Sequence, residues 1–290
     1  MVKLNTIEVL SATLFVLGSG LAETFTTLPE AKAWMGAKTA EMVRGCRVPM
    51  KDGTAAYLPQ VGSGYQAFWL RDYAYILEGG ASFIPEPELL AAVRVFLKAQ
   101  RADGACVDCV KFDGTPIYKP GYGTFGENPV ADGSPFTVAV VYLTWQQTAR
   151  PELLAKEVLD KLILAMKAEP RKDGLVWIDP AKAYDRCPYG FTDSVHKQGQ
   201  CLFTSLLMIE ADRRLSEMLG AAGRVEEAHA FALDAESTAT AVNRVFWDES
   251  KGLYRAATVK CREHDVWGSA FAVWLGVAPA ERAKRIAETL

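Results

Sequence analysis

Residues 67–79 read AFWLRDYAYILEG, a segment that is apolar along most of its length and carries Arg71 and Asp72 side by side near its start. Its apolar positions recur with the period of an α-helix rather than that of a strand. They also cover nearly every face of that helix, which is typical of a helix buried in a protein core. The segment therefore predicts an inner helix with two charged residues at one end.

Helices of two kinds alternate along the chain. The apolar kind recurs at 134–148, 194–210 and 266–276. The other kind has a charged stripe along one side, at 86–100, 151–168, 224–246 and 279–290, and a further outer helix is expected at 29–45. Alternation of buried with half-exposed helices is typical of two concentric layers. We therefore expect an all-α fold with an inner and an outer layer of helices.

A repeated turn separates the helix pairs. Asp52-Gly53, Asp113-Gly114 and Asp173-Gly174 stand 61 and 60 residues apart, and each is followed by a short apolar stretch with an aromatic residue. A fixed period of this size is typical of stacked supersecondary units. The long loops that contain these turns precede the inner helices, so we expect short β-hairpins on one face of the ring. Asp-Gly is also a common turn in any fold, which leaves coincidence as the alternative.

Composition limits the class of protein. The chain has 290 residues, of which 50% are hydrophobic and 23% charged, and no linker-like stretch divides it. We expect a single domain over residues 23–290. A net charge of −3 gives no electrostatic footprint for nucleic acid. Seven tryptophans and an aromatic content of 10% suit a cleft that packs against sugar rings.

The first residues resemble a leader sequence. Lys3 precedes an apolar run over 9–17, and the small residues Gly20 and Ala22 fit a cleavage site after Ala22. We therefore expect residues 1–22 to be a signal peptide and the protein to be secreted or periplasmic. An ordinary first helix in a cytoplasmic protein is the alternative. No other segment has the roughly 20 apolar residues that a membrane span requires.

Six cysteines are present, but they do not predict a metal site. Cys106 and Cys109 form a lone C-x-x-C pair without a second pair or a nearby histidine. Neither a metal nor a cofactor is expected. An even number of cysteines is compatible with disulfides in an exported protein, and the pairing stays open.

The segment at Trp69-Leu70-Arg71-Asp72 resembles the Trp-x-Arg-Asp signature of glucoamylases and debranching-type glucosidases, in the six-hairpin glycosidase superfamily. The resemblance implies an (α/α)6 toroid, and it assigns Arg71 and Asp72 to the hydroxyls of a terminal sugar, with Trp69 beside them. A guanidinium fork and a carboxylate bind vicinal hydroxyls well. An Arg–Asp pair that only anchors the helix is the alternative.

Residues 125–135, FGENPVADGSP, are similar to the loop before the second inner helix of glucoamylases, with Asp132 in the best-matching position. The resemblance makes Glu127 and Asp132 candidate sugar-binding residues. The alternative for Asp132 is an N-cap of the helix that starts at Ser134.

Residues 188–197, PYGFTDSVHK, open the third inner helix, which we expect over 194–220. In glucoamylases and trehalases this loop carries the general acid, so the resemblance assigns that role to Asp193. His196 and Lys197 would then follow one turn later and line the cleft. A helix N-cap is the alternative role for Asp193.

Residues 261–268, CREHDVWG, open the fourth inner helix with a concentration of charge. Arg262 is a candidate sugar ligand, Trp267 a candidate stacking residue and Glu263 a candidate catalytic base. His264 with its acidic neighbours suggests a metal at first sight, but adjacent residues point in different directions. Capping and salt bridging are the alternative.

The resemblance implies a glycoside hydrolase of the inverting α-glucosidase type, acting on an oligo- or polysaccharide. In that mechanism a second carboxylate activates water from about 6.5–9.5 Å away. The family's base lies near its last inner helices, and we expect only about nine of the twelve helices of a full toroid here. A non-catalytic carbohydrate-binding protein, and a phosphorylase or lyase on the same toroid, are the alternatives. The oligomeric state stays open.

Overall fold

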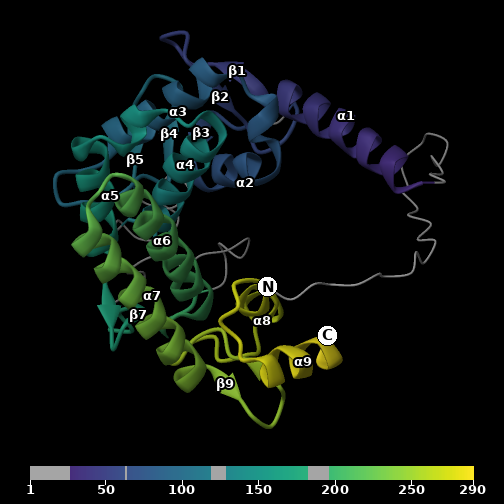
Figure 1. Cartoon of the computed structure of the whole chain (residues 1–290), viewed down its shortest axis with the longest axis vertical. Helices are drawn as coiled ribbons and strands as arrows, with labels where there is room; N and C mark the ends of the chain where they lie inside the picture. Colours follow the sequence, from purple (N-terminus) through teal and green to yellow (C-terminus); the bar gives the residue numbers. More distant parts are fainter. Residues whose placement is uncertain (1–26, 63, 119–128, 182–195) are drawn as a thin grey trace.

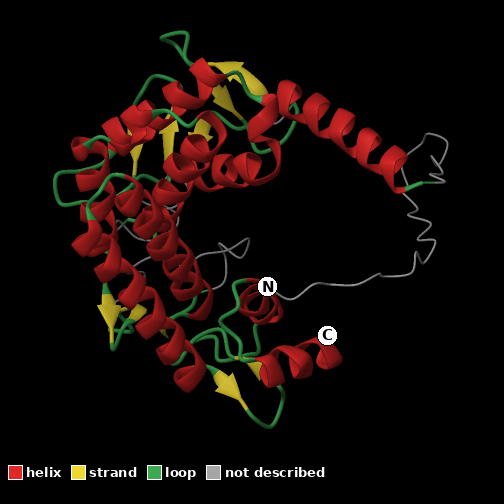
Figure 2. Cartoon of the chain, viewed as in Figure 1, coloured by secondary structure: helices red, strands yellow, loops and turns green. Residues whose placement is uncertain are grey.

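The computed structural model describes residues 27–62, 64–118, 129–181 and 196–290. Helices dominate this part of the chain, and the strands are short and lie in the connections between them (Figure 2). The α-helices are α1 (Leu28–Cys46), α2 (Leu70–Gly80), α3 (Glu86–Ala99), α4 (Gly133–Thr148), α5 (Lys156–Ala168), α6 (Leu202–Ala221), α7 (Val225–Val245), α8 (Val266–Trp274) and α9 (Ala280–Thr289). Two short 3₁₀ helices, η1 (Ala81–Phe83) and η3 (Pro151–Leu154), follow α2 and α4.

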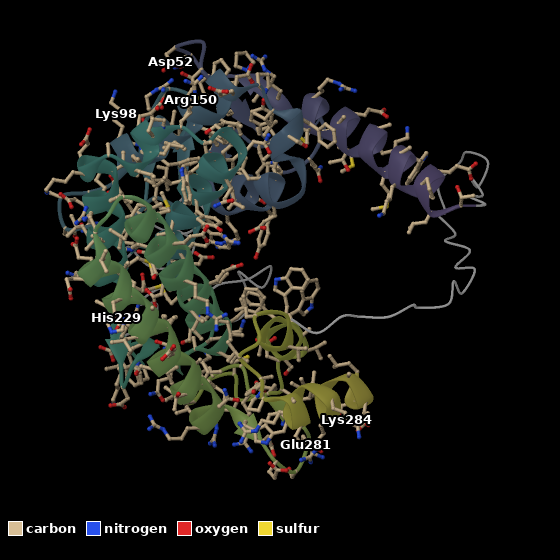
Figure 3. All side chains as sticks on the ribbon, viewed as in Figure 1. Asp52, Lys98, Arg150, His229, Glu281 and Lys284 are labelled. Atoms are coloured by element: carbon tan, nitrogen blue, oxygen red, sulfur yellow. The ribbon has the colours of Figure 1, made fainter. Side chains whose placement is uncertain are left out.

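The helices form an arc of two layers around a central opening, as Figure 1 shows. The inner layer consists of α2, α4, α6 and α8, and each of these helices contacts the next one in the series. The outer layer contains α3, α5, α7 and α9, while α1 extends away from the arc. Charged and polar residues mark the outside, at Asp52, Lys98, Arg150, His229, Glu281 and Lys284 (Figure 3). The prediction of two layers of helices is confirmed, and α4 is buried along most of its length as expected. The prediction that every inner helix is buried is wrong for α8, in which Gly268, Ser269 and Ala272 are buried while Trp267 and Trp274 are exposed.

The Asp-Gly repeat corresponds to a repeated β-hairpin. After each of α1, α3, α5 and α7 the chain forms a pair of antiparallel strands: β1 (Arg47–Pro49) with β2 (Ala55–Tyr57), β4 (Cys109–Lys111) with β5 (Pro116–Ile117), β6 (Arg171–Lys172) with β7 (Leu175–Ile178), and β9 (Trp247–Asp248) with β10 (Leu253–Tyr254). In the first three turns Gly53, Gly114 and Gly174 have φ values of 87°, 88° and 83°, which favour glycine. The period of about 60 residues therefore repeats a structural unit.

Two inner helices begin later than predicted. Ala67–Trp69 form the strand β3, which pairs with β4, so that α2 starts at Leu70. Likewise β8 (Gly199–Gln200) pairs with β7, and α6 starts at Leu202 rather than at residue 194. A hairpin from another part of the chain, β4–β5 for β3 and β6–β7 for β8, supplies backbone hydrogen-bond partners to these residues, and residues paired in this way cannot also join a helix. Gly199, with φ of 88°, lies outside helical geometry.

The core lies between the two layers. Phe68 of β3 packs against Phe96 of α3, with ring centroids 4.7 Å apart, and against Tyr73 of α2 at 4.8 Å. Helix α4 is buried along most of its length, because it has α2 and α6 on its sides and α3 and α5 behind it. No helix in the described ranges is both long and apolar enough to cross a bilayer. The five described cysteines are not bonded in disulfides.

One buried carboxylate lies between the layers without a close hydrogen-bond donor. Asp212 of α6 has no exposed surface, and neither carboxylate oxygen has a hydrogen-bond partner among the described residues. Nη2 of Arg171 lies 3.5 Å from Oδ2, which is too long for a strong hydrogen bond. Burial raises the pKa of Asp212 to about 7, with Arg171 acting against the rise and Asp234 of α7 adding to it.

The raised pKa gives a pH-dependent cost to folding. The folded protein holds the proton of Asp212 more tightly than the unfolded chain, so stability falls as pH rises from the unfolded value of 3.8 to about 7. Asp212→Asn does not titrate. We expect the variant to gain roughly 2–4 kcal/mol relative to the wild type between about pH 4 and pH 8. Urea unfolding at the two pH values measures this difference, and a difference that is independent of pH would contradict it.

The strand β8 lies close to Thr258 and Val259, and it can do so because Gly199 has no side chain. A Cβ there would meet Oγ1 of Thr258 and lie 3.0 Å from the backbone nitrogen of Val259. Gly174, in the same sheet, has a similar φ but open space around its Cβ position.

We therefore expect Gly174→Ala to lower the free energy of unfolding by about 1 kcal/mol, from backbone strain alone. Gly199→Ala should lower it by about 2–4 kcal/mol, because the clash adds to the strain. Chemical denaturation of the two variants compares them directly. Equal losses would show that the close contact contributes nothing.

Candidate functional site

Arg71 and Asp132 join the starts of two inner helices. Arg71 lies in the first turn of α2, and its Nε donates a hydrogen bond of 2.7 Å to Oδ2 of Asp132, which immediately precedes α4. The Asp132 side chain is 2% exposed and that of Arg71 15% exposed. Because a buried carboxylate needs a close cation, each group holds the other in place.

This contact corrects one reading of the sequence. Asp132 occupies the N-cap position of α4, but its side chain makes no capping hydrogen bond. The carboxylate points to Arg71, which is 61 residues earlier in the chain. A charged partner in the tertiary structure therefore takes precedence over the local cap.

A cavity of about 650 Å³ lies along the inner faces of the four inner helices. Each helix contributes residues three, four or seven positions apart, so that one stripe of each helix faces the cavity. The lining residues are Ala74, Tyr75 and Glu78 of α2; Pro135, Phe136 and Ala139 of α4; Phe203, Leu207, Glu210, Ala211 and Arg214 of α6; and Trp267, Ala270, Phe271 and Trp274 of α8. The cavity therefore runs down the centre of the arc.

Aromatic rings form much of the wall. Tyr75 meets Phe136 edge to face, with centroids 5.4 Å apart, and Phe203 stacks on Phe271 at 5.0 Å. Trp267 and Trp274 are 69% and 81% exposed on the α8 side. Flat apolar faces of this kind suit the C–H faces of sugar rings.

Arg71 lies one turn before the residues of α2 that line the cavity. It is on the same face of α2 as Tyr75 and Glu78, which are four and seven residues further along. At 1.5 Å per residue, about 10 Å of helix separates Arg71 from Glu78. The ion pair with Asp132 thus lies beyond the N-terminal end of the α2 stripe, and Glu78 lies at the other end of that stripe.

Three charged residues of the lining form a cluster between α2 and α6. Nη2 of Arg214 donates to Oε1 of Glu78 at 2.6 Å and to Oε1 of Glu210 at 2.7 Å. The Arg214 side chain is 12% exposed, whereas that of Glu78 is 43% exposed. Desolvation raises the pKa of Glu210, with Arg214 opposing the rise and Glu78 adding to it. None of these three residues was predicted from the sequence, where the available signals were the four-residue spacing of Glu210 and Arg214 and the position of Glu78 seven residues after Arg71.

The other residues expected around α2 and α6 are less close to the cavity. Trp69 ends β3 and meets the ring of Tyr65 edge to face, at 5.9 Å. Asp72 is half-buried in the first turn of α2. His196 and Lys197 precede β8, which corrects their predicted place within a helix. Burial lowers the pKa of His196, and Lys260 lowers it further.

The segment before α8 has a mainly structural arrangement. Asp265 is the N-cap of α8, its Oδ1 accepting a 2.7 Å hydrogen bond from the Gly268 amide, which confirms the capping alternative. His264 Nε2 lies 3.0 Å from Oδ2 of Asp248. Arg262 and Glu263 are exposed and do not line the cavity, whereas Trp267 does. The described residues contain no group of three or more His, Cys, Asp and Glu that could hold a metal.

Two predicted residues, Glu127 and Asp193, lie outside the described residues, as do the expected signal peptide and Cys187. Their places in the site are therefore predictions from the sequence.

No protein-family model matches the chain, and no curated protein matches it in sequence. In fold it is similar to six-hairpin glycosidases. A GH78 family rhamnosidase of a Bacillus species aligns with 86% of the chain at 19% identity and a TM-score of 0.63, over 24% of its own length. A rhamnosidase from Klebsiella oxytoca with rhamnose bound aligns with 78% of the chain at 19% identity and a TM-score of 0.61. This alignment covers 42% of the rhamnosidase chain.

A GH63 mannosylglycerate hydrolase from Thermus thermophilus, in complex with glucose, aligns with 87% of the chain at 18% identity and a TM-score of 0.61. This alignment covers 74% of the hydrolase chain. The present chain thus spans less than half of the two rhamnosidases and about three quarters of the hydrolase. The mostly helical fold is shared with parts of these glycoside hydrolases.

Substitutions at Arg71 and Asp132 test whether the two side chains interact directly. Arg71→Met leaves the buried Asp132 carboxylate without this cation, and we expect a loss of about 3 kcal/mol in the free energy of unfolding. Adding Asp132→Asn removes the buried charge and should restore at least about 1 kcal/mol. Urea unfolding of the two single variants, the double variant and the wild type measures the coupling. Strictly additive losses would contradict a direct interaction.

Proposed function

We propose that this protein is a glycoside hydrolase whose substrate enters the central cavity from the end at which Arg71 lies. The observation that carries the proposal is the buried Arg71–Asp132 pair at the starts of two helices that line an aromatic cavity. The shared fold of rhamnosidases and a mannosylglycerate hydrolase supports it. We further propose that the two layers belong to an (α/α)6 toroid.

In this proposal Arg71 orients the substrate. Asp132 fixes the guanidinium through Nε, and a planar guanidinium held in one orientation is well suited to vicinal sugar hydroxyls. Asp72, the next residue, adds a carboxylate that accepts hydroxyl hydrogens. The aromatic walls pack against the faces of the sugar ring and exclude water from it.

The chemistry requires two carboxyl groups. Asp193 is the proposed general acid, which protonates the oxygen of the leaving group. An inverting mechanism then requires a carboxylate that activates water about 6.5–9.5 Å away. Glu263 is the candidate for that base, although its exposed position outside the cavity lining gives it little support. This weakness favours carbohydrate binding without turnover as the second candidate function.

The substrate is proposed at the level of a class. An α-glucoside is the first choice, from the resemblance of the Trp69–Asp72 segment to glucoamylases. α-L-Rhamnosides and mannosides follow, because the similar structures include rhamnosidases and a mannosylglycerate hydrolase. A panel of aryl glycosides of these three sugars separates the choices.

The proposed acid is tested by Asp193→Asn. We expect hydrolysis of the best glycoside to fall by about 10²-fold or more, because the leaving group then lacks its proton donor, while sugar binding persists. Asp173→Asn is the matched control. It makes the same chemical change at a turn residue with φ of 53°, where asparagine is well tolerated.

Steady-state rates and isothermal titration calorimetry on the two variants give the result. Unchanged turnover in Asp193→Asn would refute its role as the acid. Sugar binding without any product from the wild-type protein would favour the carbohydrate-binding alternative.

A further inference from the structure

The cavity lining carries an excess negative charge where α2 and α6 face each other. Among the described residues that line the cavity, the charged ones are Glu78, Glu210 and Arg214. One nitrogen of Arg214 serves both carboxylates, at 2.6 and 2.7 Å, and the Arg214 side chain is only 12% exposed. Two carboxylates against one guanidinium leave one negative charge on the lining.

The described groups around this cluster do not change that balance. Glu217, two turns after Glu210 on α6, accepts from the neutral donors Tyr142 and Gln146. Arg213 donates to the carbonyl of Leu275 at 2.6 Å. The negative charge of Glu217 and the positive charge of Arg213 offset each other, so one excess negative charge remains in this part of the structure.

The aromatic residues of the cavity lining suit a cation as well as the apolar face of a sugar ring. Tyr75, Phe136 and Phe271 are part of an aromatic surface that continues to Trp267 and Trp274. The faces of such rings attract an ammonium group, and they also pack against the C–H faces of a sugar. The raised pKa of Glu210, due mainly to its burial, is in keeping with incomplete compensation by Arg214.

We propose that Glu78 and Glu210 make the cavity selective for a saccharide that carries a free amino group. The ammonium lies between the two carboxylates and Arg214 remains in place, while the sugar ring lies against the aromatic walls. The inference rests on the proposed function in that it takes the ligand to be a carbohydrate. A hydroxyl or an N-acetyl group at the same position is neutral and leaves the excess charge uncompensated.

Three disaccharides with one skeleton test this selectivity: the β-1,4 dimers of glucosamine, N-acetylglucosamine and glucose. Calorimetry at about pH 6, where alkyl amines are protonated, should show that the glucosamine dimer binds about tenfold more tightly than the other two. Glu78→Gln and Glu210→Gln should each abolish this advantage and leave the affinity for the glucose dimer within about twofold.

Glu217→Gln is the matched control. It removes a carboxylate from α6 near the cluster but outside the cavity lining, so the preference for the amine should persist. Circular dichroism melts of all three variants confirm that they fold. Should Glu210→Gln fail to fold, Glu78→Gln on α2 gives the same comparison independently.

The possible results separate the two proposals. Equal binding of the three dimers, or an amine preference that survives in Glu78→Gln and Glu210→Gln, overturns the selectivity and leaves the carbohydrate site intact. A preference lost equally in Glu217→Gln shows a general effect of net charge and also overturns it. Failure of the three dimers alone to bind at about 10 mM overturns the selectivity, whereas failure of the aryl glycosides to bind as well also contradicts the proposed function.

Discussion

The ion pair between Arg71 and Asp132 is the constraint on which the site depends. It bridges the first turn of α2 and the residue before α4, and its carboxylate is almost completely buried. A buried charge of this kind is tolerated only while its partner stays close, so the relative position of the two helix ends is fixed. Because both helices contribute residues to the cavity lining, the pair also fixes how their two stripes are placed relative to each other.

The strands contribute to the same geometry by deciding where inner helices begin. β3 pairs with the hairpin after α3, and β8 pairs with the hairpin after α5. Each of these strands leads directly into an inner helix, so the hairpin of one repeat sets the start of a helix in another. The charged residues at the beginning of α2 are therefore placed by backbone hydrogen bonds as well as by their own contacts.

The sequence was sufficient for the layers and for part of the site. Helices that are apolar on all faces, such as α4, are distinguished from striped ones by pattern alone, and the Asp-Gly turns revealed the repeat. Strands of two or three residues, such as β8, are too short to show a period. Asp132 was ambiguous because a cap is a local interaction, whereas its actual partner is 61 residues away. Arg214 and Glu210 stand four residues apart on α6, a spacing visible in the sequence, whereas Glu78 joins them only in the tertiary structure, where α2 and α6 both pack against α4.

The hairpin turns also bear on how such a fold can diversify. A side chain at Gly53, Gly114 or Gly174 would meet no other atom within 4 Å, so these three tips project away from the packed layers. Lengthening a tip of this kind costs little free energy, because loop-closure entropy grows slowly with length. Insertions there would add new surface while the paired strands at their base keep the helices in register. The same scaffold can thus acquire different loops during evolution without a change in its core.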